Sequence, residues 1–121
     1  MPVRLLHSSV LKWPDLETVA AAVGDWAARE ADNRPGLVKL GYFGSYARGD
    51  WGVGSDLDLV AVLDAARRPF MERPCDWDLT GLPVPAEILV YTSSEWQDTV
   101  NRGDRFAQVM SQDVVWVLDR S

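Results

Sequence analysis

Lysine and histidine are nearly absent from this chain of 121 residues, which contains only Lys12, Lys39 and His7. Arginine and lysine together number 12, against 18 aspartates and glutamates, and the formal net charge is −6. Proteins that bind nucleic acid without sequence specificity usually present a basic face. The acidic balance therefore disfavours DNA or RNA as a large docked partner.

The chain has one cysteine, Cys75, so it cannot form an intramolecular disulfide. The absence of disulfides is typical of proteins in a reducing cytoplasm. No apolar stretch reaches the roughly 18 residues that a membrane span needs. Residues 1–11 are mildly apolar but too short for the apolar core and cleavage site of a signal peptide. We therefore expect a cytoplasmic location and no contact with a membrane.

Apolar residues make up 47% of the sequence, and six tryptophans are among them, so the chain can bury a sizeable core. Its length suits one domain over residues 1–121, in which residues 1–12 form a loose N-terminal arm or an edge strand. Apolar periodicity and breakers predict helices from Pro14 to Ala31, at Ser45–Arg48 and beyond Thr92, and strands at Leu37–Phe43, Asp56–Leu63, Val84–Tyr91 and Val114–Leu118. This order predicts an α/β (α+β) fold, with a mixed sheet of about four to five strands and helices mainly on one face.

Residues 44–60 carry the most informative pattern. Gly44 and Ser45 form a turn between a strand and a short helix, where backbone N–H groups can hold phosphate. Asp56 and Asp58 follow at the start of the next strand, and alternate residues of a strand face the same side. Two neighbouring carboxylates repel each other unless a cation or a shared proton intervenes. A metal site beside a phosphate site indicates phosphoryl or nucleotidyl chemistry.

Glu87 is a third acid, inside the otherwise apolar strand at Val84–Tyr91. A buried carboxylate is costly unless a cation meets it, so we expect Glu87 to share a metal with Asp56 and Asp58. Three such carboxylates can hold two Mg²⁺ ions about 3.5–4 Å apart. Their hard oxygen atoms suit Mg²⁺ or Mn²⁺ rather than Zn²⁺.

The run Gly44-Ser45-x-x-Arg48-Gly49, followed by Ser55-Asp56-Leu57-Asp58-Leu59, resembles the signature of the minimal nucleotidyltransferases of the DNA polymerase beta-like superfamily. The resemblance implies a nucleotidyltransferase fold, with Gly44 and Ser45 at the triphosphate, Asp56 and Asp58 as metal ligands, and Glu87 as the third acid that helps to deprotonate the acceptor. Arg48 has the planar fork that suits phosphate. Two positions depart from the family pattern, because the third acid is commonly Asp and position 46, here Tyr46, is often Arg.

The activity implied by the resemblance is a magnesium-dependent transfer of a nucleotide, with AMP from ATP expected, to a hydroxyl group of another molecule. Minimal members of this family are often paired with a helical HEPN-type toxin, for which they serve as antitoxin. The resemblance thus implies a protein partner of that type, and self-association is the alternative for an exposed apolar face.

Three alternatives stay open at this point. Asp78, in the second Asp-x-Asp run of Asp76 to Asp78, replaces Glu87 as third acid if Glu87 points away from the cleft. Because fold does not imply function, the chain is alternatively a non-catalytic binding module, either a masking antitoxin or a nucleotide sensor. A small-molecule nucleotidyltransferase of the aminoglycoside type is the third reading, since an acidic surface attracts cationic compounds. Trp51 is interpreted as packing on its own domain or on a partner rather than on a base.

Overall fold

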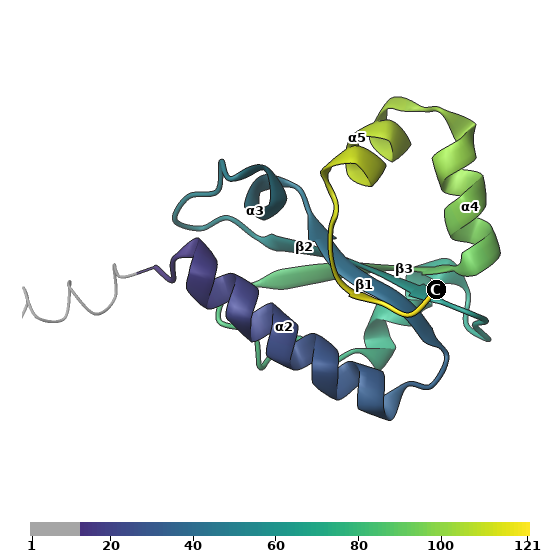
Figure 1. Cartoon of the computed structure of the whole chain (residues 1–121), viewed down its shortest axis with the longest axis horizontal. Coiled ribbons are helices and arrows are strands. Elements are labelled where there is room, and N and C mark those ends of the chain that lie inside the picture. The colour runs from purple at the N-terminus through teal and green to yellow at the C-terminus, as the bar shows by residue number, and fades with distance from the viewer. Residues whose placement is uncertain (1–12) are drawn as a thin grey trace, which may run out of the picture.

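The structure is a computed structural model that describes residues 13–121, so the predicted N-terminal arm lies outside the described residues. The predicted helices and strands are present, with bounds shifted by one or two residues (Figure 1). The irregular stretch after the second strand contains one short 3₁₀ helix. In chain order the elements are α2 (Leu16–Asn33), β1 (Leu37–Phe43), α3 (Ser45–Arg48), β2 (Leu57–Leu63), η1 (Phe70–Asp76), β3 (Ala86–Thr92), α4 (Ser93–Arg102), α5 (Arg105–Asp113) and β4 (Val115–Asp119).

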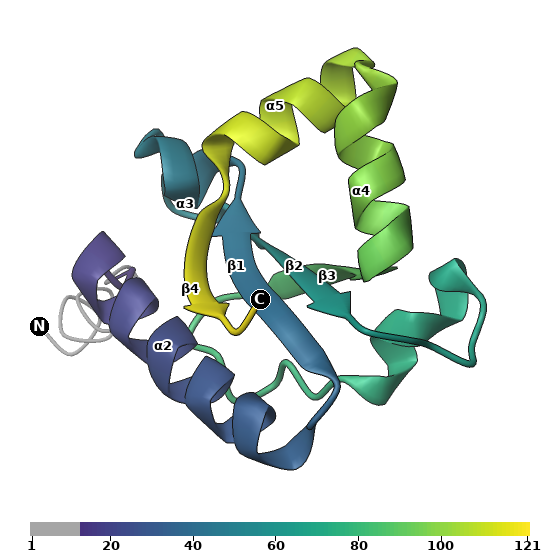
Figure 2. The same ribbon diagram turned by 45° about the vertical axis from the view of Figure 1, so that its right-hand side comes forward.

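The four strands form one mixed sheet in the order β3-β2-β1-β4, as Figure 2 shows. β1 is antiparallel to both β2 and β4, whereas β2 and β3 are parallel. β2 is central, and Leu57, Leu59, Val60 and Ala61 along it are fully buried. β3 and β4 are the two edges of the sheet.

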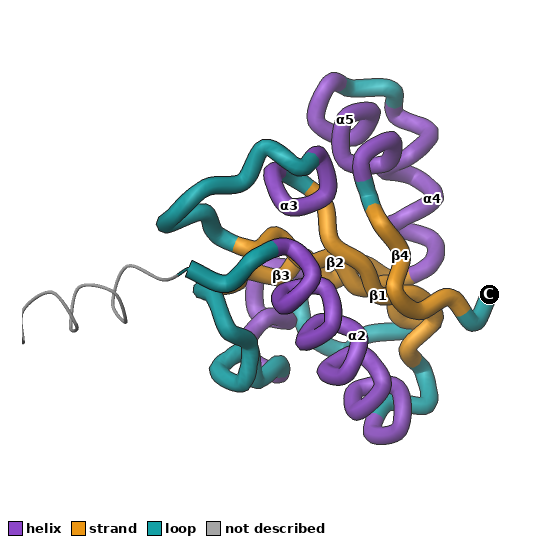
Figure 3. The backbone as a smooth tube through the Cα atoms, turned by 60° about the vertical axis from the view of Figure 1, so that its left-hand side comes forward, coloured by secondary structure: helices purple, strands orange, loops and turns teal. Residues whose placement is uncertain are grey.

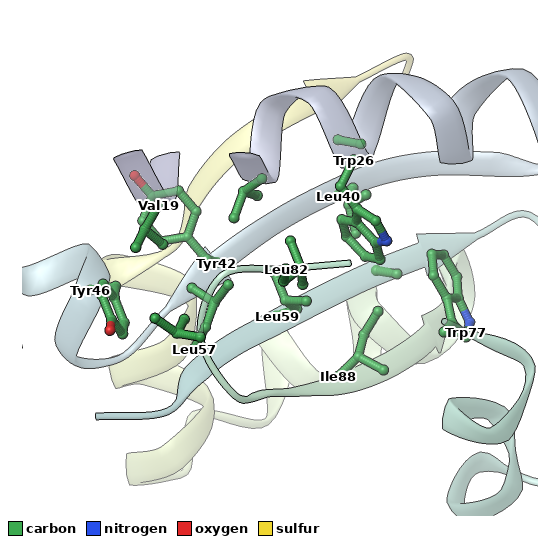
Figure 4. Packing of buried hydrophobic residues seen from close by; sticks show 14 of the residues in the cluster. Val19, Trp26, Leu40, Tyr42, Tyr46, Leu57, Leu59, Trp77, Leu82 and Ile88 are labelled. Carbon is green, nitrogen blue, oxygen red and sulfur yellow. The ribbon is translucent and has the colours of Figure 1, made fainter. Parts of the chain in front are cut away.

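The long helix α2 covers one face of the sheet (Figure 1). Its start is fixed by Asp15, whose side chain accepts a hydrogen bond from the backbone N–H of Thr18. Val19, Val23 and Trp26 recur at helical spacing and are buried against the strands. Figure 4 shows this core, in which Trp26 lies beside Trp77 with ring centroids 5.9 Å apart.

Helices α4 and α5 lie over the opposite face of the sheet, as the views in Figures 1 and 3 show. Thr92 and Glu95 form a capping box at the start of α4. Gly103, with φ of 76°, ends α4, so the helical region beyond Thr92 is divided into two helices. Met110 of α5 packs on Val60 of β2.

The helices are therefore divided between the two faces, whereas the sequence predicted them mainly on one. The reason is β2, which is apolar on both sides beyond Asp58 and so needs cover on both. The mixed four-stranded sheet and the α+β class are confirmed. No helix within residues 13–121 is long and apolar enough to cross a bilayer.

Candidate functional site

The predicted site residues gather at one end of the sheet, where β1 ends and both β2 and β3 begin. Phe43, the last residue of β1, pairs with Asp58 of β2, and Asp58 pairs with Glu87 of β3. Adjacent strands are about 4.8 Å apart, so the two acidic residues are direct neighbours. Both stand on the face that α4 and α5 cover, because the alternate residues Leu59 and Ile88 belong to the core under α2.

The three acids differ in exposure. Asp58 is half-buried, whereas Asp56, just ahead of β2, and Glu87 are exposed. The expectation that Glu87 is a buried carboxylate was therefore wrong. Its strand is an edge strand and Glu87 is the second residue of it, so water reaches the side chain despite its apolar neighbours in the sequence. Glu87 nevertheless lies beside Asp58 in the sheet.

The electrostatics of the site centre on Asp58. Partial burial raises the pKa of its carboxyl group, and the negative charges of Glu87 and Asp56 raise it further. The nearby cation of Arg48 acts in the opposite direction. Asp58 is thus an anion held among anions at the end of β2, and a bound cation would relieve this repulsion.

The Gly44 turn adjoins Asp58 directly. Gly44 has φ of 74°, a left-handed conformation that side chains disfavour, and a Cβ placed on it would overlap Oδ2 of Asp58. Glycine is therefore required here on two counts. Ser45 follows as the first residue of α3, and no side chain caps the start of this helix. The first N–H groups of a helix lack partners within it, so this turn presents free donors beside the acids.

Arg48 is at the site but its guanidinium is already engaged. It contacts Asp50 at 3.1 Å and Asp113, at the end of α5, at 3.4 Å. The arginine thus links the loop after α3 to α5. A phosphate that binds Arg48 must compete with these two carboxylates.

Tyr46, at the position that is often arginine in the resembled family, anchors the following loop. Its hydroxyl donates to the carbonyl of Ser55 at 3.3 Å and accepts from the indole N–H of Trp13 at 3.0 Å. Trp51 stacks on its ring, with centroids 5.6 Å apart and planes 7° from parallel. The prediction that Trp51 packs on its own domain is confirmed, and Tyr46 holds the loop that leads into Asp56 and Asp58.

A pocket of about 240 Å³ contains the side chains of Asp58 and Glu87. Its other walls are apolar, and two of them are the rings of Phe43 and Phe106, which meet edge to face at 6.4 Å between centroids. Phe106 comes from α5 and is 55% exposed. Sequence reasoning missed this wall, because only the folding of α5 back over the sheet brings residue 106 next to residue 43.

Asp78, the alternative third acid, lies away from this pocket. Its carboxylate accepts hydrogen bonds from the backbone N–H and the hydroxyl of Thr80, at 3.0 and 2.5 Å, which lower its pKa. Asp78 therefore stabilises a local turn and does not replace Glu87 beside Asp58. Within residues 13–121 no three Asp, Glu, His or Cys side chains are arranged to hold a metal ion together. Asp58 and Glu87 are adjacent, but Asp56 does not join them in a three-carboxylate metal site.

The sequence profile of the family described as nucleotidyltransferase domain matches residues 26–108. This chain belongs to that family. The matched stretch includes the Gly44-Ser45 turn and all three acids, and it agrees with the polymerase beta-like superfamily that the motif resembles. The chain is thus a nucleotidyltransferase by family.

Two solved structures share the fold. A crystal structure from Sulfolobus solfataricus, described as a candidate nucleotidyltransferase, is similar with a TM-score of 0.59 at 21% identity, over 86% of each chain. A toxin-antitoxin structure with AMP-PNP is similar with a TM-score of 0.56 at 17% identity, over 79% of this chain and 73% of that one. No curated protein matches the chain significantly.

Proposed function

We propose that the chain transfers a nucleotide, AMP from ATP, to a hydroxyl group of a partner protein in a magnesium-dependent reaction. The observation that carries this proposal is the pairing of Asp58 with Glu87 in the register of two parallel strands, directly beside the Gly44 turn. Membership of the nucleotidyltransferase domain family supports the same reaction class.

The donor atoms of the three acids suit a divalent cation. Asp56, Asp58 and Glu87 would hold it, and they offer only carboxylate oxygens, the ligands that Mg²⁺ and Mn²⁺ prefer. Burial, and after it the negative charges of Glu87 and Asp56, raise the pKa of Asp58, and a bound cation would offset both effects. When bound, the ion would neutralise phosphate oxygens and make an attacking hydroxyl more acidic.

The chain's own residues bind and orient the reactants. Gly44 and Ser45 offer backbone donors to the triphosphate, and Arg48 offers its guanidinium if it leaves Asp50 and Asp113. Glu87 takes the proton of the acceptor hydroxyl as that oxygen forms a bond to the α-phosphorus. The bond from the α-phosphorus to the bridging oxygen breaks, and pyrophosphate leaves with the electron pair.

A protein is the acceptor that the site geometry favours. The pocket at Asp58 and Glu87 measures about 240 Å³, and apart from the two acids its lining is apolar, without the polar groups that would orient a small polar acceptor. The exposed ring of Phe106 borders it and could meet a second macromolecule. The similar toxin-antitoxin structure with AMP-PNP supports a partnership of this kind, and we propose a HEPN-type toxin as partner and the cytoplasm as the location.

The test is incubation of the chain with α-labelled ATP, Mg²⁺ and a HEPN-type protein encoded beside it. We expect label on the partner, and a loss of about a hundredfold or more in rate for Asp58→Asn and for Glu87→Gln, the scale expected when reacting groups are misplaced. Asp78→Asn is the matched control and should retain full activity. Failure of Mg²⁺ and AMP-PNP to bind in calorimetry, together with absence of label, would refute the proposal.

One observation favours a second function, that of a non-catalytic binding module. Arg48 is held by Asp50 and Asp113, and the three acids are not gathered around one point in the structure. A masking antitoxin would need neither a free Arg48 to bind phosphate nor three acids gathered around a metal ion. Asp58→Asn distinguishes the two functions, because a masking protein keeps its biological effect in this variant whereas an enzyme loses it.

A further inference from the structure

A second pocket lies on the same face of the sheet, towards the other end of β3. It measures about 350 Å³, within the roughly 300–1,000 Å³ of small-ligand pockets, and is lined by Phe70, Tyr91, Glu95, Asp98, Thr99 and Arg102. The four lining residues of α4 are spaced as one helix face. Glu87 and Tyr91 are four residues apart on β3, about 13 Å along the strand, so this pocket is separate from the acids.

Two buried residues present hydroxyl groups to this pocket. Tyr91 is 8% and Thr99 is 4% exposed, and neither hydroxyl has a hydrogen-bond partner within residues 13–121. In the described part of the chain every fully inaccessible side-chain nitrogen or oxygen does have a partner. The oxygens of Tyr91 and Thr99 must therefore keep some access, and the pocket is where both residues reach it. Because both oxygens are open to the pocket and make no hydrogen bond within residues 13–121, they are available to a ligand.

Within residues 13–121, the charged side chains that line the pocket form ion pairs, except for the carboxylate of Asp98. Glu95 is bound by Arg73 at 2.5 Å, and Arg102 by Asp104 at 3.2 Å. Asp98 forms no ion pair within the described residues and is left with its negative charge. The carboxylate of Asp98 would therefore repel an anionic ligand and attract a cationic one.

Aromatic rings complete the lining. Phe70 and Tyr91 lie 5.1 Å apart between centroids, and the guanidinium of Arg73 already lies 5.8 Å from the ring of Phe70. Ring faces attract cations, and hydroxyl oxygens accept hydrogen bonds from N–H groups. Burial raises the pKa of Tyr91, so its hydroxyl stays protonated at neutral pH.

We propose that this pocket binds an organic cation with N–H donors, an alkylammonium or alkylguanidinium group, between the carboxylate of Asp98, the hydroxyls of Tyr91 and Thr99, and the ring of Phe70. The ammonium or guanidinium donates to the three oxygens, and its alkyl part lies against the ring. This site is additional to the nucleotide site and does not depend on the proposed reaction.

The test is titration of the full chain with n-butylammonium chloride at about 150 mM salt, followed by amide chemical shifts. We expect saturable shifts centred on Asp98 and Thr99, and binding at least about tenfold weaker for n-butanol, which has the same alkyl chain without the charge. Shifts of equal size with n-butanol would overturn the proposal, because they would indicate an apolar pocket.

Three variants separate the site from general attraction to an acidic protein. Asp98→Asn should weaken n-butylammonium about tenfold, the cost of one charge-assisted hydrogen bond, and Tyr91→Phe should weaken it several-fold while the fold stays intact. Asp25→Asn, an exposed acid on α2 across the sheet, is the matched control and should change nothing. An equal effect of Asp98→Asn and Asp25→Asn would refute a built site.

Discussion

Replacing Glu95 with glutamine isolates the energy of one ion pair. Glu95 binds the guanidinium of Arg73, whose side chain is 9% exposed and which also donates to the carbonyls of Arg68 and Val90. Glu95 additionally accepts from the backbone N–H of Thr92 in the capping box. Glutamine keeps an oxygen for that cap but loses the charge, so Glu95→Gln leaves the buried guanidinium without its counterion.

The pKa of Glu95 sets the size of the effect. Hydrogen bonds from Arg73 and Thr92 lower it from 4.5 to about 2. The full shift corresponds to roughly 3 kcal/mol. Because the Glu95 side chain is 41% exposed, solvent screens the interaction, and we expect a loss of about 1.5 kcal/mol of unfolding free energy at pH 7.

The pH dependence gives the sharper test. A carboxyl whose pKa is lower in the folded state contributes stability above its unfolded pKa, and this contribution is lost as the pH falls through the folded pKa. The difference between the natural chain and Glu95→Gln should therefore shrink between pH 4.5 and about 2. Urea unfolding at pH 7 and at pH 3 measures it. Glu72→Gln, whose partner Arg68 is 3.8 Å away in an exposed pair, is the control. A difference that stays constant with pH would refute the reasoning.

Three further substitutions probe the nucleotide site. Gly44→Ala should destabilise the chain by about 1–3 kcal/mol, because Gly44 has a positive φ and an added Cβ would overlap Asp58. This variant should also abolish AMP-PNP binding in calorimetry. Gly52→Ala, whose added Cβ meets no atom within 4 Å, is the control and should change stability and binding little. Asp58→Asn should raise the unfolding free energy at pH 7, because it removes a carboxylate that is partly buried and repelled by Glu87 and Asp56. The gain should vanish in acid, where the raised pKa leaves Asp58 neutral, and a less stable variant at pH 7 would contradict this. Tyr46→Phe should cost about 1 kcal/mol by thermal unfolding, since it breaks the contact with Trp13, and an unchanged midpoint would count against the anchoring role.

Local signals in the sequence were sufficient for most of the elements. The Thr92–Glu95 capping box, the break at Gly103 and the apolar stripe of α2 each depend on residues a few positions apart, and all three are present. Such short-range patterns reflect hydrogen bonding and periodicity within one element, which a sequence displays directly.

Long-range packing is where prediction from the sequence failed. Whether Glu87 is buried depends on its strand being at the edge of the sheet, and strand order is not written in any local pattern. The wall formed by Phe43 and Phe106, and the engagement of Arg48 by Asp113, likewise require α5 to return over the sheet. The adjacency of Asp58 and Glu87 was expected from the family resemblance and from the argument that a buried Glu87 needs a cation, and the premise of burial was wrong. Spacing alone does not give the register of two strands.

The larger core and the candidate binding sites lie on opposite faces of the sheet. The face under α2 is a continuous apolar core that extends from Val19 to Val90 and includes Trp26. The opposite face has a smaller buried cluster, and its strand ends carry the acids and both pockets described above. Alternation along β3 makes this division possible, because Glu87 and Tyr91 stand on one side while Ile88 and Val90 pack on the other. Substitutions on the face of Glu87 can therefore change binding while the core that holds the strands in register is untouched.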